Sequence, residues 1–171
     1  MSHLDDLRDT LSHARACHEA WWLFTGTHPD REKIVRVFNS YFEFFSAVRP
    51  ALYVTFIVKL ASVFGTRADE ITLKAIPDIE QHTSFANLWE RGRRFHKYRS
   101  KLIAHRDIDL ETRSYAQESG FTYDDLKMLL DDTCGLFDSA ARRLRIDPVH
   151  QLSCEADLLR FVHDLFKQRS T

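Results

Sequence analysis

The chain has 171 residues, and its 24 Lys and Arg against 25 Asp and Glu give a formal net charge of −1. Hydrophobic residues make up 44% and charged residues 29%, which is ordinary for a soluble globular chain. Only five Gly and four Pro leave little material for the many turns of an all-β fold. The length suits a single good core, so we expect one domain over residues 1–171.

The cysteines and the N-terminus indicate a cytosolic setting. Cys17, Cys134 and Cys154 are an odd set without CxxC spacing, which predicts reduced thiols and neither a disulfide frame nor a zinc site. The N-terminus carries acids where a signal peptide needs bases. The most apolar segment, 51–64, is interrupted by Lys59 and is too short to span a bilayer. We therefore expect a cytoplasmic protein with no membrane role, no metal and no cofactor.

Helical periodicity dominates the first half of the chain. A first helix is predicted over residues 4–24, and Asp30 is expected to cap a second one. The apolar stripe of this second helix continues from Ile34 to Phe64, and Pro50 is expected to kink or break it. The aromatic residues that we expect in its buried stripe are Phe38, Tyr41, Phe44 and Phe45.

The second half also has a helical pattern. Residues 66–82 are predicted to form a connection with one short helical turn, and a third helix then runs from residue 83 or 84 to about 105. The polar, acidic stretch 106–120 is expected to be a loop. Thr122 and Asp125 form a capping-box pattern that begins another helix, and Ser153 is expected to cap the last one. Four main helices with short connections predict an all-α, up-and-down bundle.

The most informative stretch lies at the end of the predicted third helix. From Arg91 to Arg106 there are seven Lys or Arg and no acid, which would attract a phosphodiester backbone. Within it Arg99 and His105 lie six residues apart, and Ser100 follows the arginine. An arginine can clamp phosphate oxygens and a histidine can transfer protons near neutral pH, so the pair could cleave RNA without a metal. The spacing alone also fits ordinary basic residues at a helix C-terminus.

The spacing places a constraint on any joint action of Arg99 and His105. Six residues advance about 600° along a straight helix, so the two side chains would point roughly 120° apart and lie about 9 Å apart along the axis. Either the helix distorts before His105, or a second copy of the chain completes the site.

The sequence Tyr-Arg-Ser-Lys-Leu-Ile-Ala-His-Arg-Asp, residues 98–107, resembles the signature of the HEPN superfamily, in particular its abortive-infection AbiU-type branch. This resemblance implies a bundle of four or five helices and metal-independent RNA cleavage that leaves 2′,3′-cyclic phosphate ends. It also implies a homodimer in which two motif helices share one cleft. Arg99 would then bind the phosphate and His105 would transfer protons. Ser100 stands where the family prefers Asn, Asp or His.

The sequence differs from one branch of the HEPN superfamily at an informative position. Asp107 stands where the branch paired with nucleotidyltransferase antitoxins has a tyrosine that becomes modified, so such modification is not expected here. Asp107 could instead orient His105 or pair with Arg106. The residues that we expect to contact RNA around the motif are Arg94, Lys97, Tyr98, Lys101 and Arg106.

Three hypotheses follow. The first is a homodimeric endoribonuclease that acts in phage defence or as a toxin, with a possible antitoxin or regulatory partner. The alternative is a non-catalytic helical module that binds RNA or a protein through the same basic cleft. The third is a structural dimer whose basic helix has no ligand.

Overall fold

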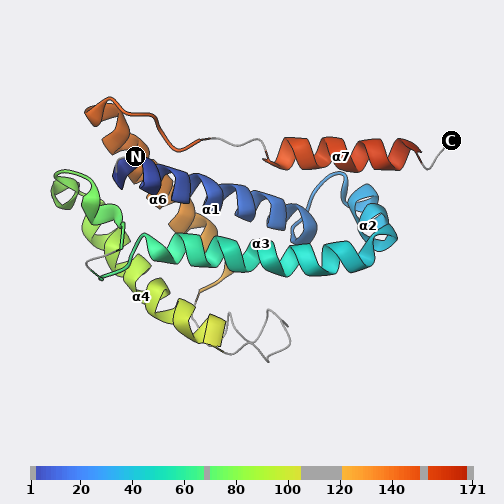
Figure 1. Cartoon of the computed structure of the whole chain (residues 1–171), viewed down its shortest axis with the longest axis horizontal. Coiled ribbons are helices and arrows are strands. Elements are labelled where there is room, and N and C mark those ends of the chain that lie inside the picture. Colours follow the sequence, from blue (N-terminus) through green and yellow to red (C-terminus); the bar gives the residue numbers. More distant parts are fainter. Residues whose placement is uncertain (1–2, 68–69, 105–120, 151–153, 169–171) are drawn as a thin grey trace.

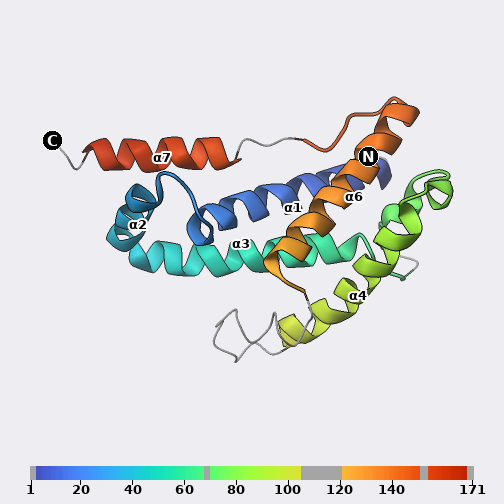
Figure 2. The same ribbon diagram turned by 180° about the vertical axis from the view of Figure 1, so that it is seen from behind.

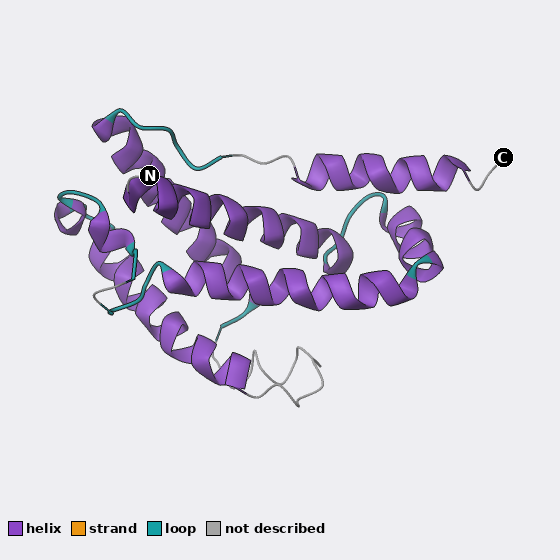
Figure 3. Cartoon of the chain, in the orientation of Figure 1, coloured by secondary structure: helices purple, strands orange, loops and turns teal. Residues whose placement is uncertain are grey.

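The computed structural model describes residues 3–67, 70–104, 121–150 and 154–168, with only the backbone for residues 98, 100–104 and 168. These residues form six α-helices and two short 3₁₀ helices, and no strand occurs within them (Figure 3). The all-α prediction is therefore confirmed. The elements are α1 (His3–Thr25), α2 (Arg31–Ser40), α3 (Phe42–Ser62), η1 (Leu73–Ala75), η2 (Ile79–Gln81), α4 (Phe85–Ala104), α6 (Tyr123–Leu144) and α7 (Cys154–Gln168).

The centre of the molecule is an antiparallel pair of long helices, α1 and α3 (Figure 1). Seen from behind, α6 lies across this pair and α4 runs beside α6 (Figure 2). The main core lies between these four helices, where Leu7, Leu11, Phe56, Leu60 and Phe137 are each at most 1% exposed. Burial of such side chains typically contributes about 1.5–3 kcal/mol each, which makes this cluster the main source of stability.

A second apolar cluster lies at the other end of α3, where α2 and α7 meet (Figure 1). Val162 of α7 is fully buried there against the α1–α2 region, and the rings of Phe24 and Phe45 pack at a tilt with centroids 5.1 Å apart. His163 Nε2 also lies 3.4 Å from Asp30 Oδ2 and adds a polar contact between α7 and the start of α2. This end of the molecule has no part in the α3–α4 packing.

The capping box predicted at the start of α6 is confirmed. The backbone N–H of Asp125 donates to Thr122 Oγ1 at 3.1 Å, and the backbone N–H of Thr122 donates to Asp125 Oδ2 at 2.8 Å. The Thr122 hydroxyl also donates to Asp125 Oδ2 at 2.7 Å, and this bond, together with the one from the Thr122 backbone N–H, holds the pKa of the Asp125 carboxyl below its usual value. The helix ends at Arg145, whose φ of 56° is left-handed and stops the α-helical pattern.

The expected second helix is two helices, and the break is not at the proline. The chain turns at Tyr41, where φ is −129° and ψ is 42°, and α3 then continues through Pro50 to Ser62. The helix is therefore not broken at Pro50, which lies inside α3, and the alternative that Pro50 kinks the helix stays a prediction. The turn at Tyr41 lets Phe45 pack back onto Phe24, so tertiary packing decides where the helix ends.

The aromatic stripe around this turn is only partly core. Phe45 is 3% exposed, as predicted, but Phe44 is 61% exposed, Phe42 55% and Tyr41 40%. The prediction that Tyr41 and Phe44 belong to the buried stripe was wrong, because it assumed one continuous helical phase across the break at Tyr41.

Asp30 precedes α2 as predicted but does not cap it with its side chain. Its carboxylate instead lies 2.9 Å from Lys33 Nζ and faces His163 of α7. The Lys33 hydrogen bond is the main reason why the pKa of Asp30 is lowered.

One helix in the described ranges, α3, is long and apolar enough to cross a membrane by length and composition, and 28% of the tested window is buried. Core helices of soluble proteins pass the same test, so this is a weak membrane signal.

Candidate functional site

Helix α4 carries the basic stretch and presents one apolar stripe to the core. Phe85, Leu88, Gly92 and Phe95 follow at helical spacing and are all buried. Arg99 is the next residue on this stripe, four positions after Phe95, and it is partly buried. The motif arginine therefore lies where the hydrophobic core ends, a burial that the motif alone does not predict.

Three contacts fix α4 against its neighbours. Gly92 allows close approach to α3, since a Cβ atom at this position would lie 2.1 Å from Phe64 Cδ1. One residue before the end of α3, Ala61 O accepts a hydrogen bond from His96 Nδ1 at 2.9 Å. The rings of Phe95 and Phe121 meet edge to face, with centroids 5.6 Å apart. The first part of the basic stretch is thus held on a rigid support.

The Nε atom of Arg99 is buried and has no hydrogen-bond partner among the described residues. A buried donor of a charged group that lacks an acceptor is unfavourable by several kcal/mol in general, so such groups normally find a partner. A phosphate oxygen would supply the missing acceptor, and arginine is well suited to bind one. This is the most specific chemical feature that the described part of the motif offers.

The other cations on α4 are open to solvent. Arg94 and Lys97 are exposed and Arg93 is partly buried, and none of the three has an ion pair within the described ranges. Arg91 differs, because its Nη1 lies 2.7 Å from Asp132 Oδ2 of α6. Positive charge is therefore concentrated toward the C-terminal half of α4, where the motif lies.

Several predicted site residues lie wholly or partly outside the described part of the chain. The backbone of Tyr98, Ser100 and Lys101 belongs to α4, but their side chains are outside the description. His105, Arg106 and Asp107 are outside the described residues altogether, as is the expected loop that follows them. The joint geometry of Arg99 and His105 thus stays a prediction.

A groove that the sequence did not indicate lies between α4 and α6, with a volume of about 520 Å³. We call it the α4–α6 groove and define it by six of its lining residues: Ser84, Asn87, Arg91, Asp131, Asp132 and Gly135. Arg91 and Asp132 join its two walls although they are 41 positions apart in sequence. Only Gly135, an unexplained glycine inside a helical pattern, could have drawn attention to it.

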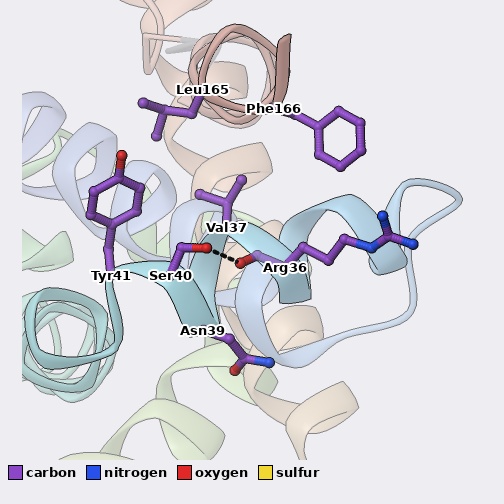
Figure 4. Close-up of a pocket in the computed structure, with 7 residues that line it drawn as sticks. All are labelled: Arg36, Val37, Asn39, Ser40, Tyr41, Leu165 and Phe166. Carbon is purple, nitrogen blue, oxygen red and sulfur yellow. Dashed lines mark hydrogen bonds between the residues drawn. The ribbon is translucent and has the colours of Figure 1, made fainter. Parts of the chain in front are cut away.

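A second cavity, of about 390 Å³, lies between α2 and α7 (Figure 4). Tyr41, Leu165 and Phe166 line it, and the Arg36 guanidinium carbon lies 5.8 Å from the Phe166 ring centroid. This cavity lies near the N-terminal end of α3, whereas α4 contacts the C-terminal end of α3 (Figure 1). The cavity is therefore separate from the motif.

Several other titratable groups of the described residues are buried or partly buried. Burial lowers the pKa of His18 to about 4, which keeps this core imidazole neutral. Burial also raises the pKa of the thiols of Cys17, Cys154 and Cys134, the last to about 12, so they are poor nucleophiles. In the part of the chain that is described, no group of three or more His, Cys, Asp or Glu is arranged to hold a metal ion.

A comparison with known protein families shows which family the chain belongs to. Residues 2–158 match the HEPN family AbiU2, which is more than nine-tenths of the chain. The chain belongs to the HEPN AbiU2 family. It is thus an abortive-infection HEPN domain, and the resemblance found in residues 98–107 extends over α1 to α6 and into α7. No curated protein and no solved structure matches the chain.

Proposed function

We propose that this HEPN domain is a metal-independent endoribonuclease that acts in the cytoplasm as a homodimer, in phage defence or as a toxin. The observation that supports this most directly is the buried, unpartnered Nε of Arg99 on a helix whose neighbouring cations, Arg94 and Lys97, are exposed. A phosphodiester would satisfy the Arg99 donor and be attracted by the exposed charges.

The roles follow from the chemistry of RNA, which carries its own nucleophile in the 2′-hydroxyl. Arg99 binds the scissile phosphate and stabilises negative charge on its oxygens as the 2′-oxygen attacks phosphorus. His105 transfers protons, from the 2′-hydroxyl or to the leaving 5′-oxygen, which yields a 2′,3′-cyclic phosphate and a 5′-hydroxyl. Ser100 contributes a hydrogen bond next to Arg99, and Asp107 orients His105.

The site is proposed to be shared between two protomers. On one straight helix Arg99 and His105 would diverge by about 120°, so a two-fold arrangement in which each copy supplies one of them resolves the geometry. Because such an enzyme would also cut RNA of its own host, we include a regulatory or antitoxin partner in the proposal.

The first experiment measures cleavage of single-stranded RNA in EDTA by the wild type, Arg99→Ala and His105→Ala. Each substitution is expected to slow cleavage by about two to four decades, since each removes one group that acts in the transition state. Arg49→Ala is the matched control, because it removes one exposed cation from α3 and leaves α4 intact. Equal rates for Arg99→Ala and the control would contradict the assignment of Arg99.

A mixing experiment tests the shared site. Arg99→Ala and His105→Ala proteins are each expected to be inactive, but their mixed dimer holds one site in which both groups are intact. Random exchange would restore about a quarter of the wild-type activity, since half of the dimers are mixed and each has one of two sites intact. If the mixture recovers no cleavage activity although the protomers are shown to have exchanged, Arg99 and His105 act within one protomer.

The alternative is a non-catalytic module that binds RNA or a protein through the same basic surface. It predicts RNA affinity that falls with rising salt, without any cleavage in the presence or absence of EDTA. A structural dimer without a ligand would show no RNA affinity at all.

A further inference from the structure

The α4–α6 groove lies beside the proposed path of the RNA. Asn87, Arg91 and Arg94 follow at spacings of four and three, so they share one face of α4, and Ser84 lies just before the helix. Positions 98, 101 and 105 continue the same spacing toward the motif. From Arg91 to residue 101 the helix advances about 15 Å. Arg99 is one position after residue 98 and so points about 100° away from this face, and a strand bound at Arg99 reaches the groove by passing around α4 over about 12 Å along the helix axis.

Gly135 keeps the groove open without serving the packing of the protein itself. It lies within α6, where glycine is less favourable than alanine by about 1 kcal/mol. A Cβ atom at this position would meet nothing within 4 Å, and the residue is exposed. No neighbour in the described structure requires a glycine here, so the space beside Gly135 is open to a ligand.

The walls of the groove offer hydrogen-bond donors and acceptors side by side. Arg91 Nη1 donates to Asp132 Oδ2 at 2.7 Å, and Asp131 lies on the α6 wall. An arginine has five N–H donors and a carboxylate has about four acceptor positions, so their pairing leaves both with capacity for a ligand. Asn87 and Ser84 add polar groups that can donate or accept.

We propose that the α4–α6 groove is a base-recognition subsite that takes a guanine of the RNA strand next to the cleaved linkage. This inference rests on the proposed function and names its substrate preference. Guanine O6 and N7 accept from arginine, and its N1–H and N2–H₂ donate to carboxylates. Adenine and cytosine each offer a single amino group as donor, so they match two carboxylates less well. Unpaired RNA bases are commonly read by such edge contacts.

The carboxylates also argue against a purely phosphate-binding groove. Asp131 pairs with Lys127 and Asp132 pairs with Arg91, so the two carboxylates offset the positive charge that would attract a phosphate, and their remaining acceptor positions can accept hydrogen bonds from a base. Phosphate binding is assigned instead to the exposed cations Arg94 and Lys97, which have no ion pair in the described residues.

The test uses the His105→Ala protein, which cannot cut by the proposed mechanism, and fluorescent oligo-U strands with one central G, A, C or U. The G-containing strand is expected to bind about tenfold more tightly than the others. Gly135→Leu should abolish this preference, because its side chain fills the groove. Gly135→Ala is the matched variant that adds only a Cβ, and it should retain most of the preference.

A second variant keeps the test valid if Gly135→Leu folds poorly. Asp132→Asn removes one acceptor-only group with little change of shape, and the preference for G should fall about tenfold. Glu90→Gln is its control, because Glu90 is exposed on α4 and does not line the groove. Circular dichroism of each variant verifies the fold.

The outcomes separate this inference from the proposed function. Equal binding of all four strands, unchanged by Gly135→Leu, would overturn the guanine subsite and leave the ribonuclease proposal standing. Absence of binding to any strand at low salt would overturn both. A preference for G that Gly135→Leu and Asp132→Asn both remove would support the subsite whether or not the wild type cleaves.

Discussion

Two glycines on facing helices show how differently the two sides of α4 are built. Gly92 of α4 is buried against α3, where a Cβ atom would lie 2.1 Å from the ring of Phe64. Gly135 of α6 is exposed beside α4, where a Cβ atom would meet no atom within 4 Å. The first glycine is required by packing, and the second is not.

The difference shows that the two sides of α4 are packed differently. We call the side that packs against the end of α3 the closed side, and the side that faces the α4–α6 groove the open side. On the closed side, Phe64 and Phe95 are at most 1% exposed, and His96 bonds to the end of α3. On the open side, one ion pair connects α4 and α6 beside a groove of about 520 Å³. A rigid side next to an accessible one is the arrangement expected of a helix that positions functional groups.

The largest expected effect comes from filling the closed side. Gly92→Ala should destabilise the protein by about 3 kcal/mol, because the fully buried Phe64 cannot move aside without disturbing the core. Urea unfolding monitored by circular dichroism measures this loss. Phe64→Leu in the Gly92→Ala background should recover part of it. A loss below about 0.5 kcal/mol would show that the α3–α4 contact is not tightly packed.

A smaller effect is expected from the buried imidazole in the same core. His18 lies against Phe56 with ring centroids 4.9 Å apart, and its pKa is lowered from 6.5 to about 4. Because the unfolded state binds the proton more tightly, stability is full above pH 6.5 and falls toward pH 4. The loss at pH 5 should be about 2 kcal/mol, measured by urea unfolding at pH 7.5 and 5.

His18→Gln provides the control for this pH dependence. The variant lacks the titrating group, so it should lose much less stability over the same interval. The lowered pKa values of Asp30 and Asp125 act at lower pH, below about 4, and do not interfere. An identical loss in both proteins would assign the pH dependence to another group.

The open side is expected to respond in the opposite direction. Gly135→Ala should stabilise the protein by about 0.5–1 kcal/mol, since alanine favours the helix and its methyl group meets no neighbour. Thermal unfolding of the variant and the wild type gives the sign. A destabilising result would mean that the space beside Gly135 is filled in solution, for example by a second copy of the chain.

The sequence predicted those features whose causes are local. The capping box of Thr122 and Asp125 was found because both partners lie within one helical turn. Phe95 is 1% exposed, and its spacing from Leu88 is the local helical pattern that places both residues on one buried face. The expected start of α4 at residue 83 or 84 is within two residues of Phe85.

Features that depend on distant segments were not predicted. The break at Tyr41 follows from the packing of Phe45 on Phe24, which a single helical pattern does not reveal. The α4–α6 groove depends on the approach of Arg91 to Asp132, 41 positions away. Arg99 was selected from the motif, but its buried Nε results from its place after Phe95 on the core stripe.

The smallest expected effect tests whether the ion pair on the open side serves stability. The side chains of Arg91 and Asp132 are 34% and 53% exposed, so water and salt weaken their attraction. A double-mutant cycle with Arg91→Ala and Asp132→Ala should give a coupling of about 0.5 kcal/mol or less, which 1 M NaCl removes. A coupling above about 2 kcal/mol would make the pair a structural link. A weak coupling instead leaves both groups available to a ligand, because little folding energy would be lost when Arg91 and Asp132 exchange part of their contact for the edge of a base.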